Sequence, residues 1–187
     1  SEGARSGTPT FFIRLQGCKA KNACYSMGIK CDTEFESGSE IDVKELHSWM
    51  NLTNLHCNEI TWTGGEPAQQ LTEEIIQYFK DKGYYQAIET SGLFPVPENM
   101  DFVCVSPKVA EHVVKKNFPN GVSELRYVRH KGQFLPEPSI KAKHYWLSPH
   151  FDGYEINNEN LRHCIKLSLD NPKWKVSVQE HKLWNIL

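Results

Sequence analysis

Residues 59–83, EITWTGGEPAQQLTEEIIQYFKDKG, contain the repeating unit that decides the fold. The first five residues are mainly β-branched or aromatic and favour a strand, and the Gly-Gly pair that follows predicts a turn. A threonine followed by two glutamates, at residues 72–74, is typical of a helix N-terminus, and Gly83 is typical of the residue that ends a helix. The stretch therefore predicts a strand, a glycine turn and a helix in succession.

The same unit occurs upstream and downstream. Residues 10–16 (TFFIRLQ) predict a strand that leads into a long polar loop, and Asp42 with Glu45 predicts the capped start of a helix over residues 43–50. Further strands are expected at residues 85–89, 102–105, 123–128, 144–147 and 174–179, and further helices at 111–116 and 157–169. Alternating strands and helices indicate an α/β domain with a parallel sheet, whose sites lie at the carboxyl ends of the strands.

The composition is that of an ordinary globular domain. Of 187 residues, 39% are hydrophobic and 24% are charged, which fits one domain. No apolar run approaches the ~20 residues of a membrane helix and no secretory signal is recognisable, so we expect a cytoplasmic protein without membrane contact. The 21 Lys and Arg residues nearly balance 23 Asp and Glu residues. The total charge therefore does not indicate a nucleic-acid partner.

Three of the six cysteines crowd into one loop. Cys18, Cys24 and Cys31 have the spacing C-x5-C-x6-C directly after the strand at residues 10–16. Structural zinc normally has four Cys or His ligands, and no His lies between Cys18 and Cys31. Spacing alone leaves metal or cluster binding and a chance grouping open. The other three are expected to pack as thiols in apolar or helical surroundings: Cys57, Cys104 and Cys164.

Five short segments accompany this loop in a fixed order. They are RLQGC at 14–18, TGGEP at 63–67, ETSG at 89–92, SPK at 106–108 and QEHK at 179–182. Together they resemble the radical S-adenosylmethionine (SAM) enzymes, and within them the 7-carboxy-7-deazaguanine synthase family, over nearly the whole chain. The resemblance implies a single radical SAM domain over residues 1–187, with a cluster loop at 17–33. The fold it implies is a partial (β/α)6 TIM-like barrel with shortened helices.

Two features depart from the pattern of that family. The common radical SAM loop is C-x3-C-x2-C, whereas here Gly28 stands three residues before Cys31 and Cys24 takes the middle role. The chain begins with Ser1-Glu2-Gly3, which resembles the end of a Gln-Gly-Glu-Gly segment, with Ser1 in place of a glycine. The first strand of the family, which would precede this segment, is therefore expected to be missing.

The resemblance also implies a reaction. The expected substrate is 6-carboxy-5,6,7,8-tetrahydropterin, whose ring contracts to 7-carboxy-7-deazaguanine with loss of ammonia, a carbon-nitrogen lyase step in queuosine (preQ0) biosynthesis. The expected cofactors are a 4Fe-4S cluster, SAM and Mg2+, and the radical made from SAM would take a hydrogen from the substrate. A homodimer and an electron donor such as a flavodoxin or ferredoxin are implied as well.

Individual residues receive roles from the same resemblance. The cluster ligands would be Cys18, Cys24 and Cys31, and the Mg2+ ligand would be Thr33, whose hydroxyl suits a hard cation. The residues expected at the SAM pocket are Gly65, Glu66, Glu89, Ser91, Ser106, Pro107, Lys108, Ser148, Pro149, His150 and Phe151. The residues expected at the substrate are Ser1, Glu2, Arg14, Thr63, His181 and Leu187.

Several of these roles have structural alternatives. Arg14 lies in an apolar strand, where a charge is costly unless paired, so it either holds the substrate carboxylate or pairs with an internal one. For Thr33 the alternative is a turn, and for Glu89 it is a carboxylate satisfied by backbone donors. The apolar tail at residues 183–187 is expected to fold back against the barrel mouth, either to place the Leu187 carboxylate at the substrate or for packing alone.

Two other classes of protein stay open at this point. A small radical SAM activase of a glycyl-radical enzyme would have a docking surface for its partner and little specificity for a pterin. A non-catalytic zinc-binding interaction module is favoured by the unusual cysteine spacing. An absorption band near ~400 nm after anaerobic reconstitution would distinguish a cluster from zinc.

Overall fold

The computed structural model describes residues 2–26, 31 and 34–184. Seven strands form one sheet, and each neighbouring pair is parallel and hydrogen-bonded in sequence order. The strands are β1 (Phe11–Leu15), β2 (Glu59–Gly64), β3 (Tyr85–Thr90), β4 (Phe102–Val105), β5 (Val122–Arg129), β6 (Ala142–Pro149) and β7 (Trp174–Val176). The predicted α/β class and parallel sheet are confirmed. The partial barrel is not confirmed, because β1 and β7 do not pair with each other and the sheet is not closed.

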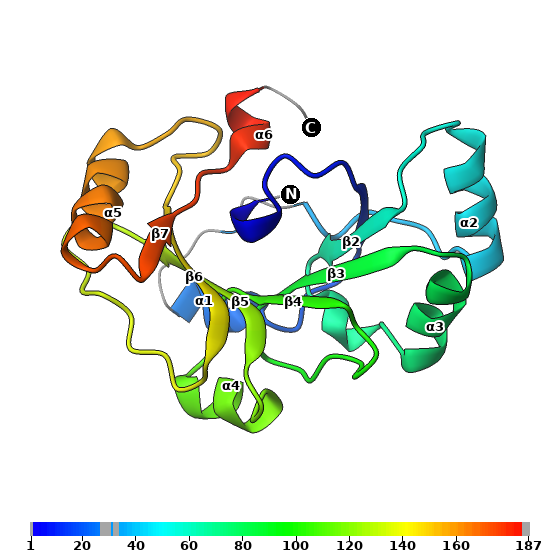
Figure 1. The fold of residues 1–187 in the computed structure, drawn as a ribbon, viewed down its shortest axis with the longest axis horizontal. Helices are drawn as coiled ribbons and strands as arrows, with labels where there is room; N and C mark the ends of the chain where they lie inside the picture. Colours follow the sequence, from blue (N-terminus) through cyan, green and yellow to red (C-terminus); the bar gives the residue numbers. More distant parts are fainter. Residues whose placement is uncertain (1, 27–30, 32–33, 185–187) are drawn as a thin grey trace.

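Helices cover the outer side of the curved sheet (Figure 1). These are α2 (Val43–Leu52), α3 (Glu73–Asp81), α4 (Glu111–Asn117) and α5 (Asn158–Asp170). Short helical segments lie elsewhere: η1 (Gly3–Arg5), α1 (Lys21–Ser26), η2 (Pro67–Gln69) and α6 (Glu180–Leu183). In Figure 1 the dark blue η1 lies on the inner side of the sheet.

The helix starts predicted from capping residues are confirmed. The Asp42 carboxylate accepts the backbone N–H of Lys44 at 2.7 Å, and Glu45 accepts the N–H of Asp42 at 3.3 Å. At α3, the Thr72 hydroxyl accepts the N–H of Ile75 at 3.4 Å. These bonds satisfy donors that a helix N-terminus leaves without partners inside the helix.

The apolar core lies between the sheet and its outer helices, in two clusters. Trp62 of β2 packs with Phe79 of α3 in the first cluster, and Trp174 packs with Cys164 in the second. The burial expected for Cys104 and Cys164 is confirmed, whereas Cys57 is half-buried. No helix in the described ranges is both long and apolar enough to span a bilayer.

The inner face of the sheet is polar. Successive residues of a strand alternate between faces, so the residues paired across the sheet with Thr63 and Glu89 share a face. The strand register aligns Arg14 with Thr63, Glu89 with Cys104, and Cys104 with Glu124. This face, opposite the helices, carries the chemistry described next.

Candidate active site

A cavity of about 480 Å³ opens at the carboxyl ends of the strands. It is bordered by residues that follow β2, β3, β4 and β6, together with the cysteine loop. The expected site residues that border it are Glu2, Cys18, Cys24, Cys31, Thr63, Gly65, Glu89, Ser91, Ser106, Lys108, Ser148, Pro149, His150 and Phe151. The loops that the sequence singled out therefore meet around one space.

Four other expected residues do not border this cavity, namely Arg14, Glu66, Pro107 and His181. Three more lie outside the described residues: Ser1, Thr33 and Leu187. The Mg2+ ligand and the terminal carboxylate expected from the sequence belong to this last group.

The Gly-Gly-Glu turn after β2 positions the start of the cysteine loop. The Gly65 N–H donates to the carbonyl of Leu15 at 3.0 Å, and the Glu66 N–H donates to the carbonyl of Gly17 at 3.0 Å. A Cβ at Gly65 would lie 2.1 Å from the Gly17 carbonyl oxygen and 2.8 Å from the Cys18 Cβ. Gly65 therefore lacks a side chain because the cysteine loop occupies that space, which is a reason the sequence did not reveal.

The Glu66 carboxylate is fully buried and joins two loops. It accepts the N–H of Ala68 at 3.1 Å, the hydroxyl of Thr90 at 2.7 Å and the N–H of Ser91 at 2.8 Å. The Ser91 hydroxyl donates to it as well. A buried carboxylate with this many donors is well satisfied, so Glu66 holds the turn after β2 against the loop after β3.

The three loop cysteines surround part of the cavity as thiols. Burial raises the pKa of Cys18 and also that of Cys24, whereas Cys31 is exposed. Thiolates are the cysteine form that binds metals, so a metal or cluster must displace these protons. Within the described residues, no three His, Cys, Asp or Glu side chains converge closely enough to hold one metal ion.

Two further loops supply polar groups to the cavity. Lys108 Nζ donates to the Ser106 hydroxyl at 2.8 Å, so the segment after β4 presents an amine held by its own loop. The His150 ring stacks on that of His130, with ring centroids 4.2 Å apart. Both loops follow strands whose buried parts fix the backbone, which gives these groups defined positions.

Arg14 pairs in the sheet with Thr63, which borders the cavity. Its side chain is exposed, because β1 is an edge of the sheet. The expectation of a charge buried in an apolar strand is therefore wrong. In the described part of the chain, no carboxylate lies within ion-pair distance of Arg14.

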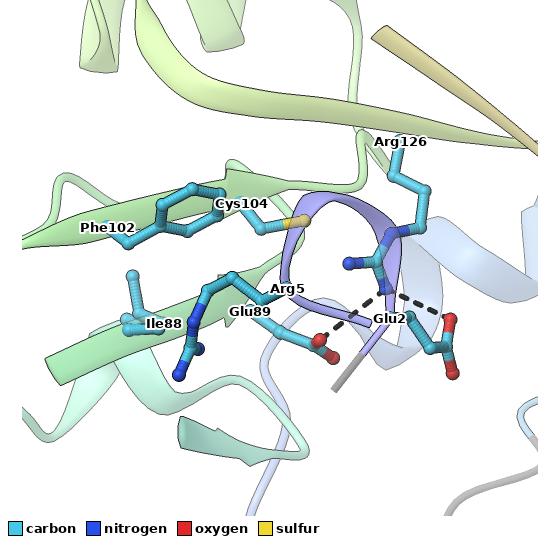
Figure 2. A pocket seen from close by; sticks show the side chains of 8 residues that line it. Glu2, Arg5, Ile88, Glu89, Phe102, Cys104 and Arg126 are labelled. Carbon is cyan, nitrogen blue, oxygen red and sulfur yellow. Dashed lines mark hydrogen bonds and ion pairs between the residues drawn. The ribbon is translucent and has the colours of Figure 1, made fainter. Parts of the chain in front are cut away.

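An ion network on the inner face was not foreseen from the sequence. Arg126 of β5 is buried, and its guanidinium contacts Glu124 at 2.7 Å, Glu2 at 3.0 Å and Glu89 at 3.4 Å. Figure 2 shows the Arg126 side chain between the carboxylates of Glu2 and Glu89. The partners come from residues as much as 124 positions apart, so no local pattern could have predicted the contact.

The segment that carries Glu2 is anchored on the inner face. The Gly3 N–H donates to the Ser177 hydroxyl at 3.0 Å, and the Ala4 N–H donates to Glu124 at 2.8 Å. Gly3 has φ +64°, and a Cβ there would lie 2.3 Å from a carboxylate oxygen of Glu124. Any other residue would be strained at this φ and would displace the Glu124 carboxylate, so glycine suits the backbone turn that follows Glu2.

The C-terminal segment approaches the same carboxylate. His181 Nδ1 lies 3.5 Å from a carboxylate oxygen of Glu2, so His181 reaches the site through Glu2. Leu183 is 51% exposed and Trp184 is 60% exposed. For these two residues the expectation that the apolar tail packs against the rest of the chain is wrong.

A scan against protein-family models found no match. The 7-carboxy-7-deazaguanine synthase of Bacteroides thetaiotaomicron is 30% identical over 188 aligned positions, which cover 99% of this chain and 92% of that protein. The enzyme of the same name from Haemophilus influenzae is 32% identical and covers 99% and 88%. The crystal structure of QueE from Escherichia coli shares the fold, with a TM-score of 0.69 at 20% identity over 95% of this chain and 88% of that one. The chain belongs to the 7-carboxy-7-deazaguanine synthase family.

Proposed function

We propose that the cavity at the carboxyl ends of the strands is the active site of this radical SAM lyase of the queuosine pathway. The reaction is the ring contraction of 6-carboxy-5,6,7,8-tetrahydropterin to 7-carboxy-7-deazaguanine with loss of ammonia. The observation that carries the proposal is that the three loop cysteines, the loops after four strands and Glu2 all border one space of about 480 Å³. A space of that size falls in the usual range for small-molecule sites.

The arrangement of the cysteines fits a cluster better than a zinc ion. Cys18, Cys24 and Cys31 all border the cavity, but the described residues contain no three ligands that converge on one point. A cluster of several irons needs thiolates spread around a volume, and three thiolates leave one iron for a further ligand. When bound, the cluster and SAM would supply the radical chemistry.

The residues around the cluster loop have positioning tasks. The Glu66 N–H holds the Gly17 carbonyl, and hence Cys18, while the Gly65 N–H holds the carbonyl of Leu15 at the end of β1. The Glu66 carboxylate fixes Ser91 at the cavity wall. Together they set the cysteine loop against the SAM pocket before any ligand binds. Such preorganisation lowers the cost of ordering the site when the cofactor enters.

The substrate end lies on the inner face, around Glu2, Thr63 and Glu89. The proposal moves Glu89 here from the SAM pocket expected from the sequence, because Arg126 joins it to Glu2. Glu2 and Glu89 are hydrogen-bond acceptors for N–H groups of the pterin, and the exposed Arg14 offers a planar pair of donors for its carboxylate. His181 steadies Glu2 from the opposite side. The Ser1 and Leu187 roles belong to the same proposal and depend on residues outside those described.

Four further parts of the proposal rest on the resemblance to the family. They are Mg2+ at Thr33, a homodimer, a flavodoxin or ferredoxin as electron donor, and a cytoplasmic reaction. Each has a direct measurement: activity against added Mg2+, the mass in solution, reduction by the purified donor protein, and fractionation of cells.

One experiment tests the central proposal. The chain is reconstituted anaerobically with iron and sulfide and incubated with the tetrahydropterin, SAM and a reductant. We expect broad absorption near ~400 nm, as thiolate-held clusters give, and the deazaguanine by mass spectrometry. A protein that carries its full cluster and cleaves SAM but forms no deazaguanine would contradict the proposal.

A further inference from the structure

The Arg126 guanidinium connects three carboxylates of different origin. Glu124 lies on the same strand and is fully buried, Glu89 comes from β3, and Glu2 comes from the N-terminal segment. Arg126 Nε and Nη2 both point to Glu124 Oε1, at 3.1 and 2.7 Å, whereas Nη1 serves Glu2 and Glu89. One edge of the guanidinium is thus anchored on the sheet and the other faces the two carboxylates that border the cavity.

The anchor itself is tightly held. Glu124 also accepts the Ala4 N–H at 2.8 Å and the Cys104 thiol at 3.3 Å. Beside this network only about 10 Å³ of space remains, roughly the volume of one water molecule. On this side the side chains have little room to rearrange, and toward the large cavity the rigid guanidinium fork holds Glu2 and Glu89 through its own contacts.

The balance of charge at this place is negative. Three carboxylates share one guanidinium, and two of the three, Glu2 and Glu89, border the large cavity. Burial opposes the charge on Arg126, but the surrounding carboxylates raise its pKa well above the usual range, so it stays charged. This end of the cavity therefore attracts N–H donors and repels a carboxylate.

We propose that Arg126 is a positioning residue that holds Glu2 and Glu89 as a preset pair of acceptors for the N–H groups of the reduced pterin. The excess negative charge turns the carboxylate of the substrate away from this end, so the network also orients the substrate. This inference rests on the proposed function, because it assigns a task within the proposed site. Arg126 borders the cavity as well, but three carboxylates engage its guanidinium, so it acts through Glu2 and Glu89.

Substitution of Arg126→Lys tests the proposal, because an ammonium keeps the charge but not the fork that serves three carboxylates. We expect the KM for the pterin to rise tenfold or more, while the KM for SAM changes less than twofold. The matched control is Arg129→Lys, the same change on the same strand but on the opposite face, where Arg129 contacts the Tyr127 ring. The control is expected to leave both KM values unchanged.

A double-mutant cycle shows whether Arg126 acts through Glu2. Glu2→Gln alone is expected to raise the pterin KM. Arg126→Lys should raise it by a smaller factor in that variant than in the parent, since coupled residues are not additive and only the effect through Glu89 remains. Independent, additive effects would overturn the proposal, as would an unchanged pterin KM in Arg126→Lys. If Arg126→Lys does not fold, Glu2→Gln and Glu89→Gln decide, and unchanged pterin KM values in both overturn it.

Activity of the unsubstituted parent protein distinguishes a failure of this inference from a failure of the proposed function. A parent that forms no deazaguanine contradicts the function, and calorimetric binding of the pterin to the same variants then replaces KM as the measurement. If the parent protein forms the deazaguanine and the variants show the expected changes in pterin KM, the proposed function and the role of Arg126 are both supported.

Discussion

The carboxylate of Glu66 accepts the backbone N–H of Ser91 at 2.8 Å, which joins the turn after β2 to the loop after β3. Both loops border the proposed active site, although Glu66 itself does not. The contact links residues 25 positions apart. Glu66 therefore positions Ser91, which borders the cavity, without bordering the cavity itself.

Removing this carboxylate should destabilise the fold. Glu66→Ala leaves buried donors at Ala68, Thr90 and Ser91 without their acceptor, and each unsatisfied donor costs about 1–3 kcal/mol. We expect the free energy of unfolding, measured with urea on the cluster-free protein, to fall by about 3 kcal/mol or more. Glu137→Ala, which removes an exposed carboxylate between β5 and β6, is the control and should change little. Equal stability of the parent and Glu66→Ala would show that the contact is not made.

Crowding at Gly65 predicts a loss of iron rather than only a loss of stability. A Cβ there would lie 2.1 Å from the Gly17 carbonyl oxygen, so Gly65→Ala must push the start of the cysteine loop away. We expect less than half of the iron of the parent after reconstitution. Gly83→Ala is a control, because Gly83 has φ +84° but open space around it. It should lower stability by about 1 kcal/mol and leave the iron content unchanged.

The six cysteines should divide into two groups of three. We expect Cys18→Ala, Cys24→Ala and Cys31→Ala each to lower the iron bound per chain, because all three thiols border the cavity. Replacing Cys57, Cys104 or Cys164 should leave it unchanged wherever the variant folds. Iron analysis after anaerobic reconstitution checks this, and full iron content in Cys24→Ala would refute the middle role given to that residue.

Stability in alkaline solution should report on Cys164. Burial raises the pKa of this thiol from 9.0 to about 11. The folded chain thus holds the proton more tightly than the unfolded chain, so this stabilisation is complete below pH 9 and is lost as the pH rises toward 11. The difference in unfolding free energy between the parent and Cys164→Ala should therefore shrink by about 1 kcal/mol at pH 10. Urea unfolding at pH 8, 9 and 10 measures it, and a constant difference would show that the thiol has the same pKa in the folded and unfolded chains.

Local signals predicted most of the fold. The bounds of β4 agree with those expected, and the caps at Asp42 and Thr72 begin helices as predicted. The misses are short elements: α1, six residues long, and α6, four residues long, are too short to show a helical period.

The sequence predicted those parts of the candidate site in which a motif lies at the end of a strand. It did not predict the parts that depend on contacts between residues far apart in the sequence. The segments that begin at Cys18 and Ser106 follow predicted strands, and the resemblance to the family singled out both of them and Ser148, which lies near the end of β6. The contacts of Arg126 and of the buried Glu66 carboxylate join residues that are far apart in the sequence. No periodicity or local motif in the sequence indicates such contacts. The open edge at β1, which exposes Arg14, likewise follows from strand order rather than from its own sequence.

Arg14 gives the sharpest test of how the substrate is oriented. It is exposed, it lies in register with Thr63 at the cavity, and no carboxylate of the described residues pairs with it. Arg14→Lys replaces a planar pair of donors by a point charge, so we expect the KM for the carboxylated pterin to rise about tenfold, or 1.4 kcal/mol. Cleavage of SAM without substrate and the melting temperature should stay unchanged, because the side chain holds neither the cysteine loop nor the core. Arg162→Lys, at an exposed position on α5, controls for the substitution. Equal loss of SAM cleavage and pterin turnover would instead show that Arg14 stabilises the edge strand β1 and does not bind the substrate.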